Sequence, residues 1–366
     1  MHGVPIRRST VVLGVLSLAL VAVLVGALRA AAGPPGASYT VTPLVSDIPG
    51  AAPLTDSELV NGWGLARSAT SPWWVADNGP DPSSSHSTVY SAAGSKVLSV
   101  SVPGGPTGAV FAGVAGNFMI GTEADPNTTA PAKFIFATEA GDIRAWQAGP
   151  SALVAPTTGI ANGAVFKGLA IAQPTPGSPL LYAADFHNGQ VDVIDGSWNV
   201  VTPAGAFVDP NLPAGYAPFG IQAIGSDIFV TYGKQDADAH DELDGQGLGF
   251  VDEYDLQGNL VARVASSGQL NAPWGLAMAP ASFGRFAGDL LVGNFGNGQI
   301  NAYANGDDGW HHAGTLRSPS GGRLVIDRLW ALEFGNAGSN GNPDTLFFTA
   351  GPNDESDGLF GTITPG

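Results

Sequence analysis

The chain has 366 residues, no cysteine and a formal net charge of −17. The absence of cysteine excludes disulfides, iron–sulfur centres and thiolate metal sites. The acidity, with no cluster of Lys or Arg beyond the extreme N-terminus, argues against binding to nucleic acid or to anionic lipid, because both need cationic groups.

The N-terminus has the pattern of a targeting segment. Arg7 and Arg8 precede an apolar run over residues 11–28, and three alanines at 30–32 offer a small-residue cleavage site. We therefore expect a signal peptide over residues 1–32 and a linker over 33–38, which places the protein outside the cytoplasm or in the cell envelope. The apolar run is also just long enough to span a bilayer, so an uncleaved N-terminal anchor stays open as the alternative.

A six-fold repeat organises residues 39–366, which we expect to form a single domain. Its marker is a strand centred on glycine, in the order Trp63-Gly64, Thr107-Gly108, Lys167-Gly168, Phe219-Gly220, Trp274-Gly275 and Trp330-Ala331. The spacing of 44 to 60 residues is typical of a four-stranded propeller blade with its loops. The fold class is therefore all-β, a six-bladed β-propeller. The last repeat is one strand short, and we expect the alternating segment 39–45 to pair with it and close the ring.

Polar residues follow the second strand, or precede the first strand, of nearly every repeat. In an up-and-down blade these two positions meet on one face of the ring, around the mouth of the central channel. The candidate ligand-binding residues there are Asn61, Asp77, Asn78, Lys167, Asp185, His187, Asn294 and Asn297. Their oxygens suit Ca²⁺ or Mg²⁺ and equally a sugar or polyol. The alternative is structural, because tight turns require Asp, Asn and Gly in any protein.

Aromatic residues begin four of the six inner strands. Trp63, Phe219, Trp274 and Trp330 occupy equivalent positions, so they should form a partial ring. Trp63, Trp274 and Trp330 are candidates for stacking against a ligand. The alternative is a hydrophobic plug that fills the centre of the propeller. The glycine after Trp63, Phe219 and Trp274 predicts close packing between neighbouring blades.

An insertion over residues 234–249 is the most acidic stretch of the chain. Asp236, Asp238 and Asp241 are candidate metal ligands, with Ca²⁺ as the candidate ion. The stretch departs from the EF-hand pattern at His240 and at Gly247, where that pattern has Asp or Asn and Glu. A solvated acidic loop without a metal is the alternative.

Irregular loops carry a resemblance to a known family. The segments Leu44–Gly50, Leu59–Gly64, Tyr232–Asp238 and Leu346–Gly351 resemble the signatures of a family of exported bacterial six-bladed propeller proteins. More distantly, the repeats resemble NHL-type blades and the calcium-dependent gluconolactonase group. The resemblance implies a six-bladed propeller and a secreted location, and it implies no particular activity. The gluconolactonase group has polar metal ligands where this chain mostly has aromatic residues.

No catalytic motif of the nucleophile-elbow, zinc-protease, phosphate-loop or dinucleotide type is present in the sequence. We therefore favour a monomeric, non-enzymatic binding or scaffold protein for a glycan, a small molecule or a protein partner. The alternative is a divalent-cation-dependent, lactonase-like hydrolase. That hydrolase would have Asp77, Asp185, His187 and Asn294 near its metal or substrate.

Overall fold

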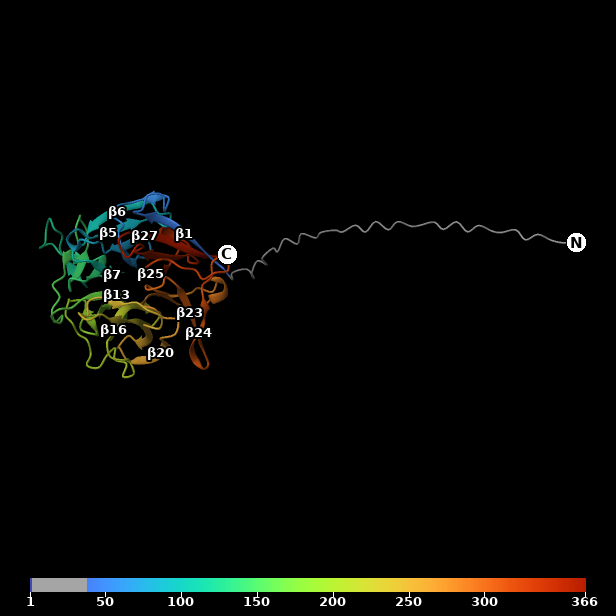
Figure 1. Ribbon diagram of the computed structural model, residues 1–366. Helices are drawn as coiled ribbons and strands as arrows, with labels where there is room; N and C mark the ends of the chain where they lie inside the picture. Colours follow the sequence, from blue (N-terminus) through green and yellow to red (C-terminus); the bar gives the residue numbers. More distant parts are fainter. Residues whose placement is uncertain (2–37) are drawn as a thin grey trace. The chain divides into compact units, whose positions relative to one another are not determined.

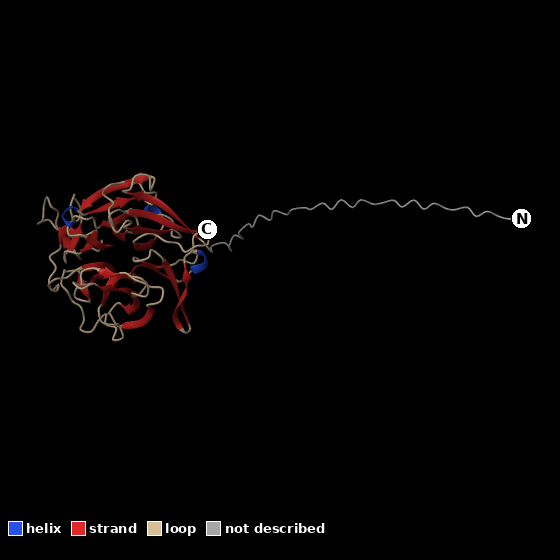
Figure 2. Ribbon diagram, in the orientation of Figure 1, coloured by secondary structure: helices blue, strands red, loops and turns tan. Residues whose placement is uncertain are grey.

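Six sheets arranged around a central axis make up the folded part of the chain. The computed structural model describes Met1 and residues 38–366. In Figure 1 the sheets follow one another around the ring in sequence order, from blue through green and yellow to red. Figure 2 shows that strands dominate the fold; the helical elements of residues 38–366 are three short 3-10 turns, Pro82–Ser84, Gly284–Phe286 and Gly338–Asn340. The six-bladed propeller predicted from the repeats is confirmed.

The first three blades are built mostly from strands of five residues or more. Blade 1 consists of β3 (Gly62–Ala66), β4 (Trp73–Asp77), β5 (His86–Tyr90) and β6 (Lys96–Ser101). Blade 2 consists of β7 (Pro106–Phe111), β10 (Phe134–Thr138), β11 (Ile143–Trp146) and β12 (Leu153–Val154), with a small hairpin of β8 (Met119–Ile120) and β9 (Ala130–Pro131) in its first loop. Blade 3 consists of β13 (Phe166–Thr175), β14 (Ser178–Asp185) and β15 (Gln190–Asp195). In place of a fourth strand, Val201 N–H donates to the Val193 carbonyl at the outer edge of β15.

Blades 4 to 6 each have four main strands, and blades 4 and 6 each have one short extra strand. Blade 4 consists of β16 (Tyr216–Ile224), β17 (Asp227–Gln235), β19 (Phe250–Asp255) and β20 (Leu260–Ser266), with β18 (Glu242–Leu243) paired to the end of β17. Blade 5 consists of β21 (Pro273–Met278), β22 (Leu290–Asn294), β23 (Ile300–Gly306) and β24 (Gly309–Thr315). Blade 6 consists of β25 (Leu329–Phe334), β26 (Leu346–Ala350), β27 (Leu359–Pro365) and β1 (Tyr39–Ser46), with β2 (Leu54–Thr55) at its outer edge.

The ring is closed by strands from opposite ends of the chain. β1 pairs antiparallel with β27 from Tyr39↔Pro365 to Ser46↔Leu359, and Figure 1 shows the blue strand beside the red one. This confirms the prediction that the N-terminal segment completes the last blade. Closure leaves each blade with inter-blade packing on both faces and removes the open end that a linear array would expose.

Glycine permits the close approach of neighbouring blades at the inner strands. A Cβ atom on Gly64 would lie 2.4 Å from the Thr107 carbonyl oxygen, and one on Gly220 would lie 2.1 Å from the Trp274 carbonyl oxygen. Both distances are too short for non-bonded atoms. The recurring glycine is therefore a packing requirement of the propeller, which explains why it marks the repeat.

The targeting segment expected over residues 1–32 lies, apart from Met1, outside the described residues. The part of the chain that the structure describes contains no helix with the length and apolar character needed to cross a membrane.

Candidate functional site

All six blades contribute to one polar cavity of about 580 Å³ at the end of the channel where the inner strands begin. Its lining residues lie before or at the start of inner strands, or directly after second strands. From blades 1 to 3 come Asn61, Trp63, Asn78, Gly79, Pro80, Pro82, Glu139 and Lys167; from blades 4 to 6 come His240, Asp241, Glu242, Asp244, Phe295, Arg328, Asp354, Glu355 and Ser356. Its volume is in the range that accommodates small-molecule ligands, about 300–1,000 Å³.

The insertion of blade 4 reaches this cavity because it folds back on its own blade. β18 pairs with the end of β17, with Glu242 opposite Gln235. Within the connecting turn, the Asp236 carboxylate accepts hydrogen bonds from the backbone N–H groups of Asp238 and His240. Asp236 therefore shapes the turn, whereas His240, Asp241 and Glu242 line the cavity. The channel mouth and the insertion, two separate candidates in the sequence, meet in one place.

Lys167 carries a buried positive charge at the base of the cavity. The side chain is 1% exposed, and its Nζ lies 5.2 Å from the centre of the Trp63 ring. Nζ forms ion pairs with Glu139 and, at 3.0 Å, with Asp241 Oδ1. Burial opposes the charged form, but the carboxylates of Glu139, Glu242 and Asp241 outweigh it and raise the pKa of Lys167. The ammonium is therefore a fixed charge, and it ties blades 2, 3 and 4 together.

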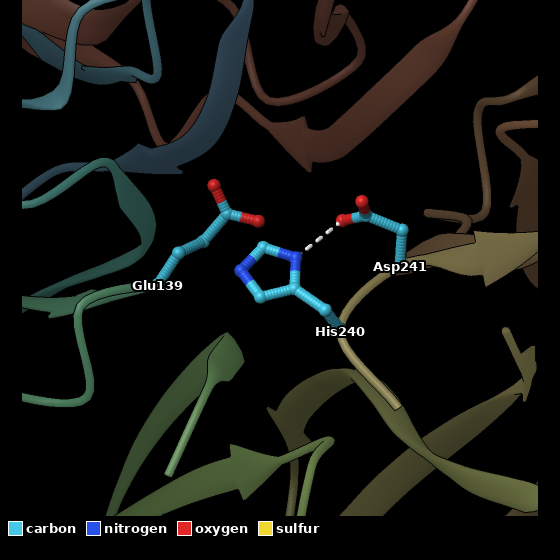
Figure 3. Close-up of side chains that lie close together, drawn as sticks. All are labelled: Glu139, His240 and Asp241. Carbon is cyan, nitrogen blue, oxygen red and sulfur yellow. Dashed lines mark hydrogen bonds and ion pairs between the residues drawn. The ribbon is translucent and has the colours of Figure 1, made fainter. Parts of the chain in front are cut away.

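Glu139, His240 and Asp241 form the one cluster of potential metal ligands among the described residues. Figure 3 shows the His240 ring between the two carboxylates. His240 Nδ1 lies 2.9 Å from Asp241 Oδ1, and the three ligand atoms lie within 4.8 Å of one another. Of the three metal candidates from the sequence, Asp241 alone belongs to this cluster; Asp238 is exposed.

Arg328 forms a second ionic clamp on the other side of the cavity. Its guanidinium pairs with Asp244 at 2.8 Å and with Asp354 at 2.7 Å, and it lies 4.8 Å from the centre of the Phe295 ring. The clamp links the insertion of blade 4 to the loop that follows β26 in blade 6.

Glu242 and Glu355 are the two carboxylates of the cavity without a cationic partner within 4 Å in the described part of the chain. Removal from water raises the pKa of Glu242 to about 8; Lys167 opposes this rise, and the Glu355 carboxylate adds to it. Burial also raises the pKa of Glu355, although its side chain accepts a 2.8 Å hydrogen bond from Asn61 Nδ2. Both groups hold their protons more tightly than ordinary glutamates.

The aromatic residues of the inner strands pack against one another below the cavity. Trp330 is fully buried and lies between Trp63 and Phe295, with ring centres 3.5 and 4.2 Å away. Its Nε1 donates to Asn61 Oδ1 at 3.0 Å. Trp274 and Phe219 meet Trp63 edge-on. The four rings fill the centre as a plug, and of them Trp63 alone lines the cavity.

Several sequence candidates lie inside the blades and not at the cavity. The Asp185 carboxylate accepts hydrogen bonds from Val165 N–H and from the backbone and side chain of Asn188. In the equivalent turn of blade 5, Asn294 Nδ2 donates to Asn297 Oδ1 and to the Gln269 carbonyl. These pairs close their own turns. The candidates that do not line the cavity are Asp77, Asp185, His187, Trp274, Asn294, Asn297, Trp330, Asp236 and Asp238.

Asp77 differs from its counterparts because its turn lacks the matching asparagine. Three residues after Asp185 and Asn294 the chain has Asn188 and Asn297, but three residues after Asp77 it has Pro80. Asp77 Oδ2 accepts a hydrogen bond from Thr88 N–H, while Oδ1 is buried without a partner in the described structure. Burial raises the pKa of Asp77 well above its usual value.

Sequence reasoning considered Glu355 only as part of the acidic segment 353–358, a second candidate cation loop, and it did not single out Glu242, Asp244, Phe295 or Arg328 as members of the cavity. The insertion was the available signal, since its length breaks the repeat at a second-strand end. The loop after β26 breaks the repeat in the same way, but the sequence contains nothing that pairs its acids with Arg328.

Comparison with known proteins places the chain among relatives of viral origin. No family model matches it. The uncharacterized protein R648 of Acanthamoeba polyphaga mimivirus is 30% identical over 344 residues, which cover 89% of this chain and 80% of R648. The uncharacterized protein L690 of the same virus is 29% identical over 343 residues, which cover 89% and 86% of the two chains.

A solved structure confirms the fold at lower identity. The soluble aldose sugar dehydrogenase of Escherichia coli, in its apo-form, superposes with a TM-score of 0.50 over 90% of this chain and all of that chain, with 14% identity. Similarity at this level reports the propeller architecture alone.

The expectation that the chain belongs to a bacterial family was wrong, because the curated relatives that match it are mimivirus proteins. Blade motifs and the loops between them report a shared fold, and they do not identify the kind of organism that carries it. The extent of the match to R648 shows that this chain belongs to the same protein family as R648 of the mimivirus.

Proposed function

We propose that the protein is a binding protein that holds a small polyhydroxylated molecule, such as a monosaccharide or a linear polyol, in the cavity at the channel mouth. The observation that carries the proposal is the convergence of all six blades on one polar cavity of about 580 Å³. Carboxylates, side-chain amides, an ammonium and a guanidinium line it together. Hydroxyl groups both donate and accept hydrogen bonds, so a polyol suits such a mixed lining.

The ionic clamps support binding because they hold the lining in place before a ligand arrives. Lys167 fixes Glu139 and Asp241, and Arg328 fixes Asp244 and Asp354. Side chains that are already ordered lose little conformational entropy on binding, which favours affinity. The plug beneath the cavity closes the channel with packed aromatic rings and gives the site a rigid base.

A blocking variant tests the proposal. Ser356 is exposed and lines the cavity, so Ser356→Tyr should obstruct it. We expect glucose or sorbitol to bind to the wild-type protein in calorimetry, and Ser356→Tyr to weaken that binding at least about tenfold, or about 1.4 kcal/mol. Ser226→Tyr, in the exposed turn before β17, is the matched control. Absence of binding to the wild type, or equal binding by both variants, would contradict the proposal.

Hydrolysis is the second candidate function, and Glu242 is the observation that favours it. A carboxyl group with a pKa of about 8 in a cavity can deliver or accept a proton near neutral pH. Asp77, Asp185, His187 and Asn294, the residues first considered for a hydrolase, do not line this cavity. The test is a screen of lactones and glycosides, repeated with Glu242→Gln. Turnover that disappears in this variant would support hydrolysis.

Lys167 argues against a divalent cation at the cluster of Glu139, His240 and Asp241. Ca²⁺ bonds to oxygen at about 2.4 Å, and Asp241 Oδ1 lies 3.0 Å from Lys167 Nζ. A calcium ion on that oxygen would lie within about 5.4 Å of the buried ammonium, where like charges repel. The carboxylates already have a cation, so we propose that ligand binding in the wild-type protein does not require Ca²⁺.

A further inference from the structure

The charges of the cavity are not evenly compensated. Six carboxylates line it, against two cations. Lys167 forms ion pairs with Glu139 and Asp241, and Arg328 with Asp244 and Asp354, so four carboxylates share two positive charges. Glu242 and Glu355 have no ion-pair partner within 4 Å among residues 38–366. Both line the same cavity, Glu242 from the insertion of blade 4 and Glu355 from the loop after β26 in blade 6. The cavity therefore has more carboxylates than cations, and these two are the ones without an ion pair.

The positions of both carboxylates are supported by the fold. Glu242 lies on β18, whose pairing with β17 fixes its backbone. Glu355 accepts a hydrogen bond from Asn61, and Asn61 is itself held by Trp330 of the plug. The indole N–H of Trp63, which is 2% exposed, has no hydrogen-bond partner in the described structure, and its ring lines the same cavity. A carboxylate has about four acceptor sites, so both glutamates can accept further hydrogen bonds, Glu355 in addition to the one from Asn61.

We propose that Glu242 and Glu355 together bind the ammonium group of an amine-bearing polyol. The inference depends on the proposed function and narrows its ligand class from polyols in general to amino polyols and amino sugars. A primary ammonium donates three hydrogen bonds, so it can satisfy both glutamates at once. A divalent cation is a poorer match, since Ca²⁺ takes six to eight oxygen ligands and the other four carboxylates are already ion-paired.

The experiment compares two linear polyols that differ at one position. Glucamine carries a primary ammonium where sorbitol carries a hydroxyl group. Their affinities are measured by calorimetry at pH 7 for the wild type, Glu242→Gln and the control Glu123→Gln. Glu123 is exposed and does not line the cavity. We expect the wild type and the control to bind glucamine at least about tenfold tighter than sorbitol.

In Glu242→Gln we expect the affinity for glucamine to fall about tenfold, and the affinity for sorbitol to change less than about twofold. Equal affinities of the wild type for both polyols would overturn the inference and leave the proposed function standing. Failure of both polyols to bind would overturn both. If Glu242→Gln does not fold, as checked by its melting curve, Glu355→Gln replaces it, and the wild-type ratio of affinities still decides the inference.

Discussion

Two kinds of turn meet near the channel mouth, and they use their polar residues differently. In the regular turns of blades 3 and 5, Asp185 pairs with Asn188 and Asn294 pairs with Asn297, each inside its own blade. In the segments that interrupt the repeat, the insertion 234–249 and the loop 352–358, Asp241, Asp244 and Asp354 pair with cations of other segments, and all three line the cavity. The regular turns of blades 3 and 5 thus keep their polar residues inside the blade, whereas the irregular segments add acids to the candidate site.

Among the regular parts of the fold, a substitution in the aromatic plug should reduce the free energy of unfolding most. Trp330→Ala removes a fully buried ring that is stacked between two others, so we expect a loss of about 3–5 kcal/mol in the free energy of unfolding. Denaturant unfolding measures it. Trp310→Ala, at a partly buried tryptophan of β24, is the control and should cost less than half as much. Equal losses of stability in the two variants would contradict the prediction that the central plug contributes more to stability than a partly buried ring of β24.

Substitutions in the regular turns should cause the second-largest loss in the free energy of unfolding. Asp185→Ala leaves Val165 N–H and the Asn188 donors without their acceptor, so we expect a loss of about 2–3 kcal/mol in the free energy of unfolding. Asp185→Asn is the matched control and should recover most of that loss, because blade 5 has asparagine at this position. Polyol affinity should be unchanged in both variants. A fall in affinity without a fall in stability would show that Asp185 takes part in ligand binding and does not only stabilise its turn.

Glu242 in the insertion should make the free energy of unfolding depend on pH. The pKa of Glu242 is about 8 in the folded protein against 4.5 for an ordinary glutamate, so the folded state binds more protons between these values. Wild-type stability therefore falls as the pH rises through this window. Glutamine does not ionise, so Glu242→Gln should be more stable than the wild type at pH 6, by about 2 kcal/mol, and nearly equal to it at pH 4. Melting curves at both pH values test this, and a difference independent of pH would contradict it.

Calcium should have the smallest effect. With Lys167 paired to Glu139 and Asp241, millimolar Ca²⁺ should shift the wild-type melting temperature by less than about 1 °C, since ligand-linked stabilisation requires binding. Lys167→Gln frees both carboxylates beside His240, and its melting temperature should become dependent on Ca²⁺. A large shift in the wild type that a chelator reverses would show that the ammonium does not exclude the ion.

The sequence predicted the parts of the fold that depend on repetition. Five glycine-centred strands and the matching strand at Trp330-Ala331 predicted six blades, and the unmatched strand at 39–45 predicted the closure by β1. The positions of Asp185 and Asn294 predicted side chains at the channel mouth. Both side chains instead form hydrogen bonds within their own turns and do not line the cavity. The sequence did not predict that Glu242, Glu355 and Arg328 line one cavity. Their meeting depends on the paths of two irregular loops from different blades, and periodicity carries no information about such paths.

One measurement tests the central claim that the cavity, and not the regular turns, is the binding site. Glucamine affinity and the free energy of unfolding are measured on the same samples of Glu242→Gln and Asp185→Ala at pH 7. The account predicts a crossed result: Glu242→Gln loses affinity without losing stability, while Asp185→Ala loses stability and keeps its affinity. If Asp185→Ala loses the affinity and Glu242→Gln retains it, the account is contradicted.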